Sequence, residues 1–83
     1  MSSTAMVISP EQCRAARAWL DWKQEELAAK AGVSLSTVRD FEKGRRTPIA
    51  NNARALAEAF GEAGLDLTFD EDDKPLGVVR RRS

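Results

Sequence analysis

The fold is decided by residues 24–44, which read QEELAAKAGVSLSTVRDFEKG. The spacing of apolar residues predicts two short helices, the first over about Gln24–Ala31 and the second over about Leu35–Lys43. Gly32 suits the left-handed position that ends a helix, and the Ser34 side chain can cap the next one. The stretch therefore predicts two short helices that are joined by a tight turn.

The side chains at the turn fit this arrangement. Ala28 is small enough to stand where the two helices approach each other closely, and Val33 with Val38 can fill the angle between them. Two short helices at a tight turn, the second capped by a small polar residue, form the helix-turn-helix plan.

A longer helix is expected on each side of this pair. Ser9, a proline and Gln12 form a capping-box start for a helix that runs to about Leu20. The composition of Ala50–Ala63 is strongly helical, with an apolar stripe that faces the core. We expect the large aromatic residues of the helical region to be core residues: Trp19, Trp22 and Phe60.

The character of the chain changes after Gly64. Apolar and polar residues alternate over Leu65–Phe69, which is typical of a strand, and Leu76–Arg81 can return as a second strand after a turn. An isolated hairpin is marginal in water, so this one must pack on the helices or on the hairpin of a second chain.

These elements predict a mainly α fold, with four helices and a short C-terminal β-hairpin. The expected organisation is a flexible N-terminus at 1–8, a helical domain at 9–64, a hairpin at 65–81 that could serve in dimerisation, and a tail at 82–83.

Composition narrows the classes of function. The 83 residues suit one domain, and the formal net charge is zero, although basic residues gather between Arg39 and Arg54. The single cysteine, Cys13, and the lack of histidine argue against a zinc site, and no cofactor is expected. The sequence has neither a phosphate-binding loop nor paired carboxylates in a plausible cleft, so we do not expect an enzyme. The sequence also has no apolar run long enough to cross a membrane, and its N-terminus does not look like a secretory signal. We therefore expect a cytoplasmic protein.

The combined pattern resembles the Cro/repressor family of helix-turn-helix regulators, often called XRE-type. The similarity covers about residues 9–60 and rests on QEELAAKAGVS at 24–34, TVRDFEKGR at 37–45 and Thr47-Pro48. The resemblance implies a lambda-repressor-like fold whose third helix, here 35–43, enters the major groove of double-stranded DNA.

In this family the N-terminal residues of that helix contact bases. The implied set here is Ser34, Leu35, Ser36, Arg39 and Asp40. Arg39 is the best direct reader, because arginine can hold a guanine edge with two hydrogen bonds.

The resemblance also implies contacts to phosphates and one structural ion pair. The implied phosphate contacts are Lys23, Gln24, Lys43, Arg45 and Arg46, and the implied pair is Arg17 with Glu42. The chain departs from the family in two places. Lys23 replaces the usual small capping residue, and a strand pattern replaces the usual fifth helix, which puts the common helical dimer surface in doubt.

We therefore expect a sequence-specific transcriptional regulator, a repressor that acts as a homodimer. The neutral net charge and the acidic stretch Asp66–Asp73 leave an alternative open, namely a protein-interaction module such as the antitoxin-like partner of another protein.

Overall fold

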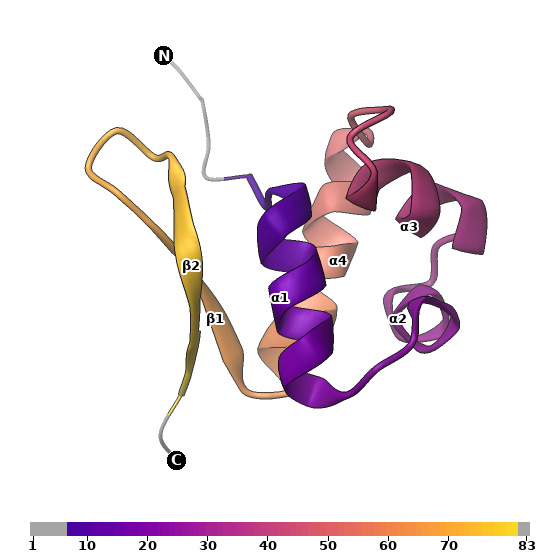
Figure 1. Cartoon of the computed structure of the whole chain (residues 1–83), viewed down its shortest axis with the longest axis horizontal. Helices are drawn as coiled ribbons and strands as arrows, with labels where there is room; N and C mark the ends of the chain where they lie inside the picture. Colours follow the sequence, from indigo (N-terminus) through magenta and orange to yellow (C-terminus); the bar gives the residue numbers. More distant parts are fainter. Residues whose placement is uncertain (1–6, 82–83) are drawn as a thin grey trace.

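The computed structural model describes residues 7–81, so the tail predicted at 82–83 and most of the predicted flexible N-terminus lie outside the described residues. Four helices precede two antiparallel strands, which confirms the predicted fold class (Figure 1). The elements are α1 Pro10–Leu20, α2 Gln24–Ala31, α3 Leu35–Glu42, α4 Ala50–Glu62, β1 Leu65–Phe69 and β2 Pro75–Arg80. None of the helices among the described residues is long and apolar enough to cross a membrane.

Local sequence signals set most of these boundaries. The Ser9 hydroxyl accepts the Gln12 backbone N–H, and the Gln12 side chain accepts the Ser9 N–H, both at 3.0 Å, so the predicted capping box is present. Gly32 ends α2 with a left-handed φ of 71°. The third helix ends one residue earlier than predicted, because Lys43 is its C-cap. The predicted ends of α4 and β2 are also off by a single residue.

The core lies between the helices and one face of the hairpin. Its largest fully buried side chains are Phe60, Leu27, Leu56, Leu65 and Val38. Ile8 is also buried against this core, although it falls in the predicted N-terminal segment.

The three aromatic residues expected in the core behave differently. Phe60 is fully buried, and Trp22 stacks on it with ring centroids 5.8 Å apart. Trp19 is 50% exposed, so the prediction of a core role for it is wrong. Trp19 lies on the same side of α1 as Ala15 and Ala18, which are also exposed, so this whole side of the helix faces away from the core.

The hairpin packs on the helices, which is one of the two possibilities that the sequence left open. Leu65 is buried, and Leu67 and Val78 pack against the core from the same face of the sheet. The Gln12 side-chain amide donates to the carbonyls of Thr68 and Gly77, each at 2.9 Å. One side chain of α1 therefore holds both strands.

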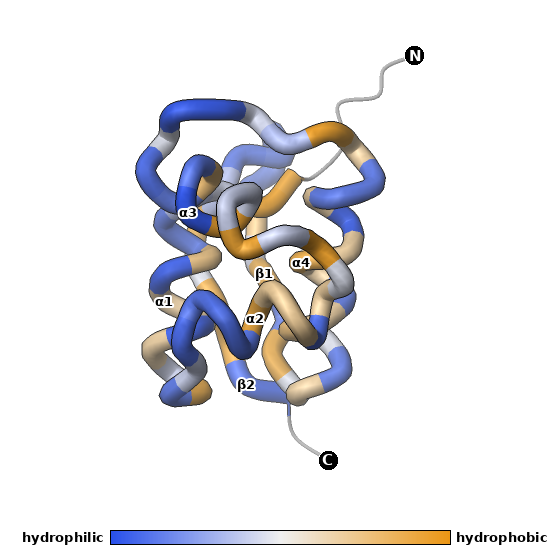
Figure 2. Tube along the Cα trace, turned by 90° about the vertical axis from the view of Figure 1, so that its right-hand side faces the viewer, coloured by the Kyte–Doolittle hydropathy of each residue, from blue (hydrophilic) through white to orange (hydrophobic). Residues whose placement is uncertain are grey.

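The elements form layers across the molecule. Figure 1 shows the hairpin at one end, α1 and α4 in the middle, and α2 with α3 at the other end. Figure 2 views the molecule from the α2–α3 end, where the segment that follows α3 is mostly hydrophilic.

Candidate nucleic-acid interface

A buried ion pair holds the C-terminal end of α3 to α1. The Arg17 Nε and Nη2 atoms donate to the two carboxylate oxygens of Glu42, each at 2.7 Å, and the Glu42 side chain is 3% exposed. A bidentate contact of this kind fixes both position and orientation. The pair that the family resemblance implied is present, and it joins α1 to the last residue of α3.

Two more side chains complete the shell around the Glu42 carboxylate. The Gln24 amide donates to Oε1 and the Cys13 thiol to Oε2, each at 3.0 Å. Burial by itself raises the pKa of Glu42, but the hydrogen bonds from Arg17, Cys13 and Gln24 outweigh it and hold that pKa below its usual value. Burial also raises the pKa of the Cys13 thiol, with the hydrogen bond to Glu42 acting in the same direction. The carboxylate therefore stays charged while it ties α1, α2 and α3 together.

Sequence reasoning did not find this role for Cys13 or Gln24. Cys13 carries no motif, and Gln24 was expected to contact phosphate. Its amide nitrogen has two hydrogens, of which one is used by Glu42, so the second remains available. In the sequence, Gln24 is recognisable only as the first residue of α2, and this position does not reveal that its partner is Glu42, 18 residues away.

The outer side of α3 is polar and exposed. The Ser34 hydroxyl accepts the Thr37 backbone N–H at 3.1 Å and lies 3.2 Å from the Ser36 hydroxyl. Ser36 and Arg39 are exposed, whereas Leu35 is partly buried. Ser34 therefore caps the helix and stays at the surface, beside the residues expected to read bases.

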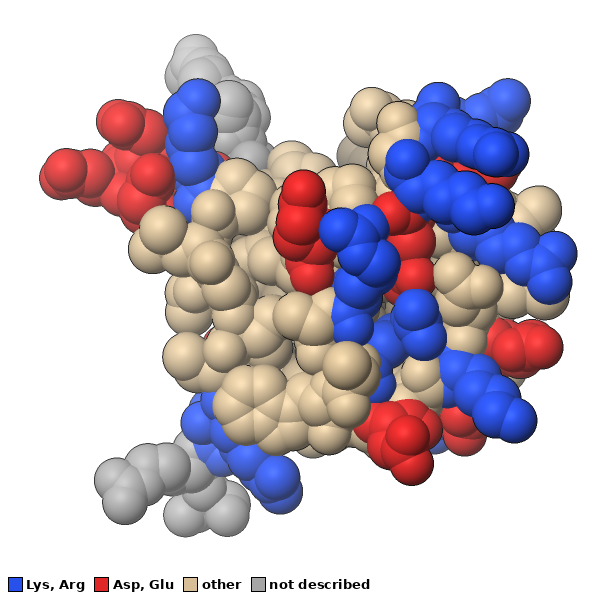
Figure 3. Space-filling view, in the orientation of Figure 1, with Lys and Arg blue, Asp and Glu red and all other residues tan. Residues whose placement is uncertain are grey.

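Basic residues continue from α3 into the segment after it. Lys43, Arg45 and Arg46 are all exposed, and Figure 3 shows lysine and arginine side chains gathered over this end of the molecule. Within residues 7–81 none of these three takes part in a salt bridge. This end therefore presents positive charge, even though the whole chain is neutral.

The start of α2 is also open. Lys23 makes no side-chain cap, as the sequence suggested, but Glu26 accepts the Lys23 backbone N–H at 2.8 Å. Among the described residues, the backbone N–H groups of Gln24 and Glu25 have no acceptor. Free N–H groups at a helix start favour an anion, and the exposed Lys23 charge adds to this.

A small hollow separates α3 from the start of α4. Asp40 and Arg46 line it, together with two polar residues that were not among the expected DNA contacts, Thr47 and Asn52. The N-cap of α4 is Ile49, which offers no side-chain hydrogen bond. A helix start without a polar cap, next to basic residues, is the sequence signal that could have drawn attention to this hollow.

Comparisons with known proteins agree with this geometry. A family model described as Helix-turn-helix matches residues 14–67. An uncharacterized HTH-type transcriptional regulator of Methanocaldococcus jannaschii is 40% identical over 58 residues, which are 70% of this chain and 88% of the relative. A second uncharacterized HTH-type transcriptional regulator, from Methanothermobacter thermautotrophicus, is 41% identical over 51 residues, 59% of this chain and 74% of the relative. The chain therefore belongs to the helix-turn-helix family, in agreement with its resemblance to the XRE-type regulators.

Proposed function

We propose that the protein is a sequence-specific DNA-binding transcriptional regulator that inserts α3 into a major groove. One observation carries the proposal: α3 is held by a buried ionic network on one side and exposes Ser36 and Arg39 on the other. A rigid helix with polar side chains on its outer surface is what base readout requires.

The proposed base contacts come from the first two turns of α3. Arg39 reads a guanine through two hydrogen bonds, and Ser36 donates to or accepts from a neighbouring base edge. Leu35 contacts a thymine methyl, and Asp40 accepts from a cytosine amino group. The Ser34 hydroxyl, which already caps the helix, completes the set.

The proposed phosphate contacts flank the groove on both sides. Lys43, Arg45 and Arg46 hold one strand after α3, while Lys23 and the start of α2 at Gln24 hold the other. These contacts position the helix without reading sequence, and they make the affinity fall steeply as salt rises.

We further propose that the protein acts as a repressor in the cytoplasm, and as a homodimer. A domain of this size can block transcription by occupying its site. Two copies related by a twofold axis would bind half-sites about one helical turn apart.

Selection of bound duplexes from a random library, repeated at two salt concentrations, tests the proposal. A palindromic site is the expected result. Arg39→Ala should then lower affinity for that site by about 1–3 kcal/mol and relax preference at one base pair. Lys43→Ala should weaken all duplexes alike and reduce the salt dependence.

Arg54→Ala is the matched control, because Arg54 is an exposed arginine of α4 outside the proposed contact set. Binding that survives both Arg39→Ala and Lys43→Ala unchanged at moderate salt would exclude α3 as the reading helix.

A further inference from the structure

The outer edge of β2 carries free backbone groups. The Arg81 N–H donates to the Gly64 carbonyl at 2.7 Å, and the register then places Leu65 opposite Arg80 and Leu67 opposite Val78. Because hydrogen-bonded and non-bonded pairs alternate in an antiparallel ladder, the polar backbone groups of Val78 and Arg80 point away from β1. The β1–β2 ladder therefore does not use their N–H groups, and no turn, loop or cap hydrogen bond uses them within the part of the chain that the structure describes.

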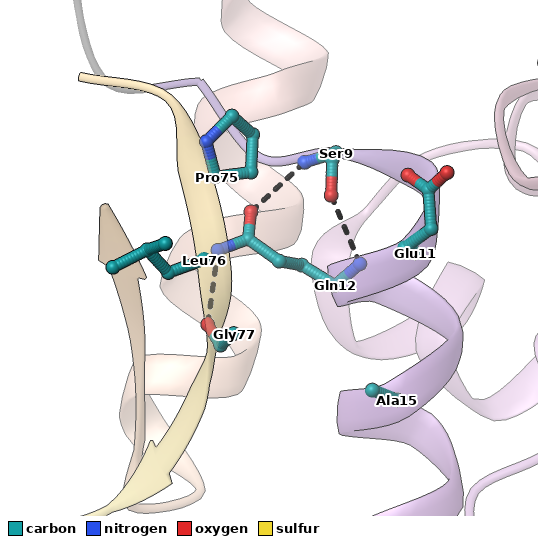
Figure 4. Close-up of a pocket in the computed structure, with 7 residues that line it drawn as sticks. All are labelled: Ser9, Glu11, Gln12, Ala15, Pro75, Leu76 and Gly77. Carbon is teal, nitrogen blue, oxygen red and sulfur yellow. Dashed lines mark hydrogen bonds between the residues drawn. The ribbon is translucent and has the colours of Figure 1, made fainter. Parts of the chain in front are cut away.

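An exposed face of α1 lies beside this edge. Ala15 of α1 and the segment 75–77 of β2 line one hollow, together with Gln12 (Figure 4). The exposed residues Ala18 and Trp19 continue the face along the helix. On the strand, Leu76, which also lines this hollow, is 67% exposed. Free strand groups and uncovered apolar side chains therefore occur together on one side of the molecule.

We propose that a second copy of this chain covers the α1–β2 face, and that the two β2 strands pair antiparallel across a twofold axis. The outward backbone groups of Val78 and Arg80 make this pairing, with Val78 of each copy opposite Arg80 of the other. The resulting interface is isologous, with the same residues from both copies. This interface describes how the homodimer of the proposed function would form. Only its role in DNA binding rests on that proposed function.

The charges along the hairpin favour a second copy as the occupant. The turn at one end of β2 holds Asp70, Glu71, Asp72 and Asp73 with one lysine. The other end of β2 holds Arg80, which has no carboxylate partner among the described residues, and then Arg81, which pairs with Asp66. Figure 3 shows the acidic and basic groups at opposite ends of the hairpin. Antiparallel pairing brings the basic end of each β2 toward the acidic end of the other, while parallel pairing would place like charges together.

The symmetry of this pairing also suits DNA binding. Two antiparallel strands of one continuous sheet are related by an axis perpendicular to the sheet. Here the sheet packs on α1 and α4, and α3 lies beyond those helices (Figure 1). The axis therefore points from the hairpin toward the α3 end, and both copies present α3 on the same side.

Sedimentation equilibrium of the full chain, over a range of concentrations, tests the proposal. The expected species is a dimer of twice the 9.1 kDa chain mass. Arg80→Pro removes an N–H that the hairpin itself does not use and should weaken the dimer at least about tenfold. Ala15→Glu should have a similar effect, because it places a desolvated charge in the interface.

Ala29→Glu is the matched control, since Ala29 is an exposed helix alanine on α2, away from this face. It should leave the dimer unchanged, and circular dichroism should show that all three variants fold. Amide hydrogen exchange in the wild type should show protection at Val78 and Arg80 that rises with concentration.

A chain that stays monomeric at millimolar concentration, or a dimer that tolerates both interface variants, would overturn the proposal. Capture of an unrelated protein on this face by a chain that stays monomeric would overturn it as well. Binding of single half-site DNA is measured separately, so a monomer that still binds would refute this interface without refuting the proposed function.

Discussion

The third helix and the hairpin are held to the molecule by different interactions. A buried carboxylate, Glu42, anchors α3 and receives hydrogen bonds from Arg17, Gln24 and Cys13. The hairpin depends on apolar contacts and on the neutral amide of Gln12. A charged network fixes direction closely but is costly to break, whereas apolar packing with a neutral hydrogen bond adapts more easily. The element proposed to read DNA has the more directional support.

Removal of the carboxylate should have the largest effect. Glu42→Ala leaves Arg17 without its partner and should lower the free energy of unfolding by about 3 kcal/mol, measured by urea denaturation. The double variant Arg17→Met with Glu42→Leu should lose less than Glu42→Ala alone, because apolar side chains replace both charges. If the double variant lost more stability than Glu42→Ala, the ion pair would stabilise the fold more than apolar side chains in the same place can.

Acid should distinguish the two regions as well. The pKa of Glu42 is lowered in the folded protein, so its contribution to stability is complete above its ordinary value of 4.5 and is lost as the pH falls through the folded value. In the hairpin turn, backbone N–H groups of Lys74 and Asp72 lower the pKa of Asp70, whose carboxylate lies at the surface.

Urea denaturation between pH 3 and pH 7 checks this difference. Glu42→Gln should flatten the loss of stability below pH 4.5 more than Asp70→Asn does, because solvent screens the exposed carboxylate. Equal slopes for the two variants would contradict a special role for the buried network.

The loss of Gln12, which holds the hairpin to α1, should have the next largest effect on stability. Gln12→Ala removes the donor to Thr68 and Gly77 and half of the capping box, which should cost about 1–3 kcal/mol. Hydrogen exchange should rise in β1 and β2 while α3 stays protected. Gln24→Ala is the converse variant, expected to loosen α2 and α3 and to leave the hairpin unchanged.

The smallest effect should come from the cap of α3. Ser34→Ala removes the acceptor for the Thr37 N–H and should cost about 1 kcal/mol, less than Glu42→Ala. Thermal unfolding measures both variants under the same conditions. A larger loss for Ser34→Ala would mean that the cap, rather than the buried network, holds α3 in place.

Elements were predictable where the signal was local. The capping box at Ser9, the glycine at 32 and the alternation after Gly64 each act within a few residues, and the observed boundaries follow them closely. The pairing of Arg17 with Glu42 came from family resemblance, since no local rule links residues 25 apart. The proposed DNA contacts have the same origin and remain a prediction.

By itself, the sequence determined four helices, a hairpin and a helix-turn-helix, because helix caps and hydrophobic periodicity depend on near neighbours along the chain. Only the tertiary structure decided that Gln12 reaches carbonyls 56 and 65 residues away, that Gln24 turns toward Glu42, and that Trp19 stays at the surface. These outcomes depend on which surfaces meet when the elements pack, and packing is a property of the whole chain.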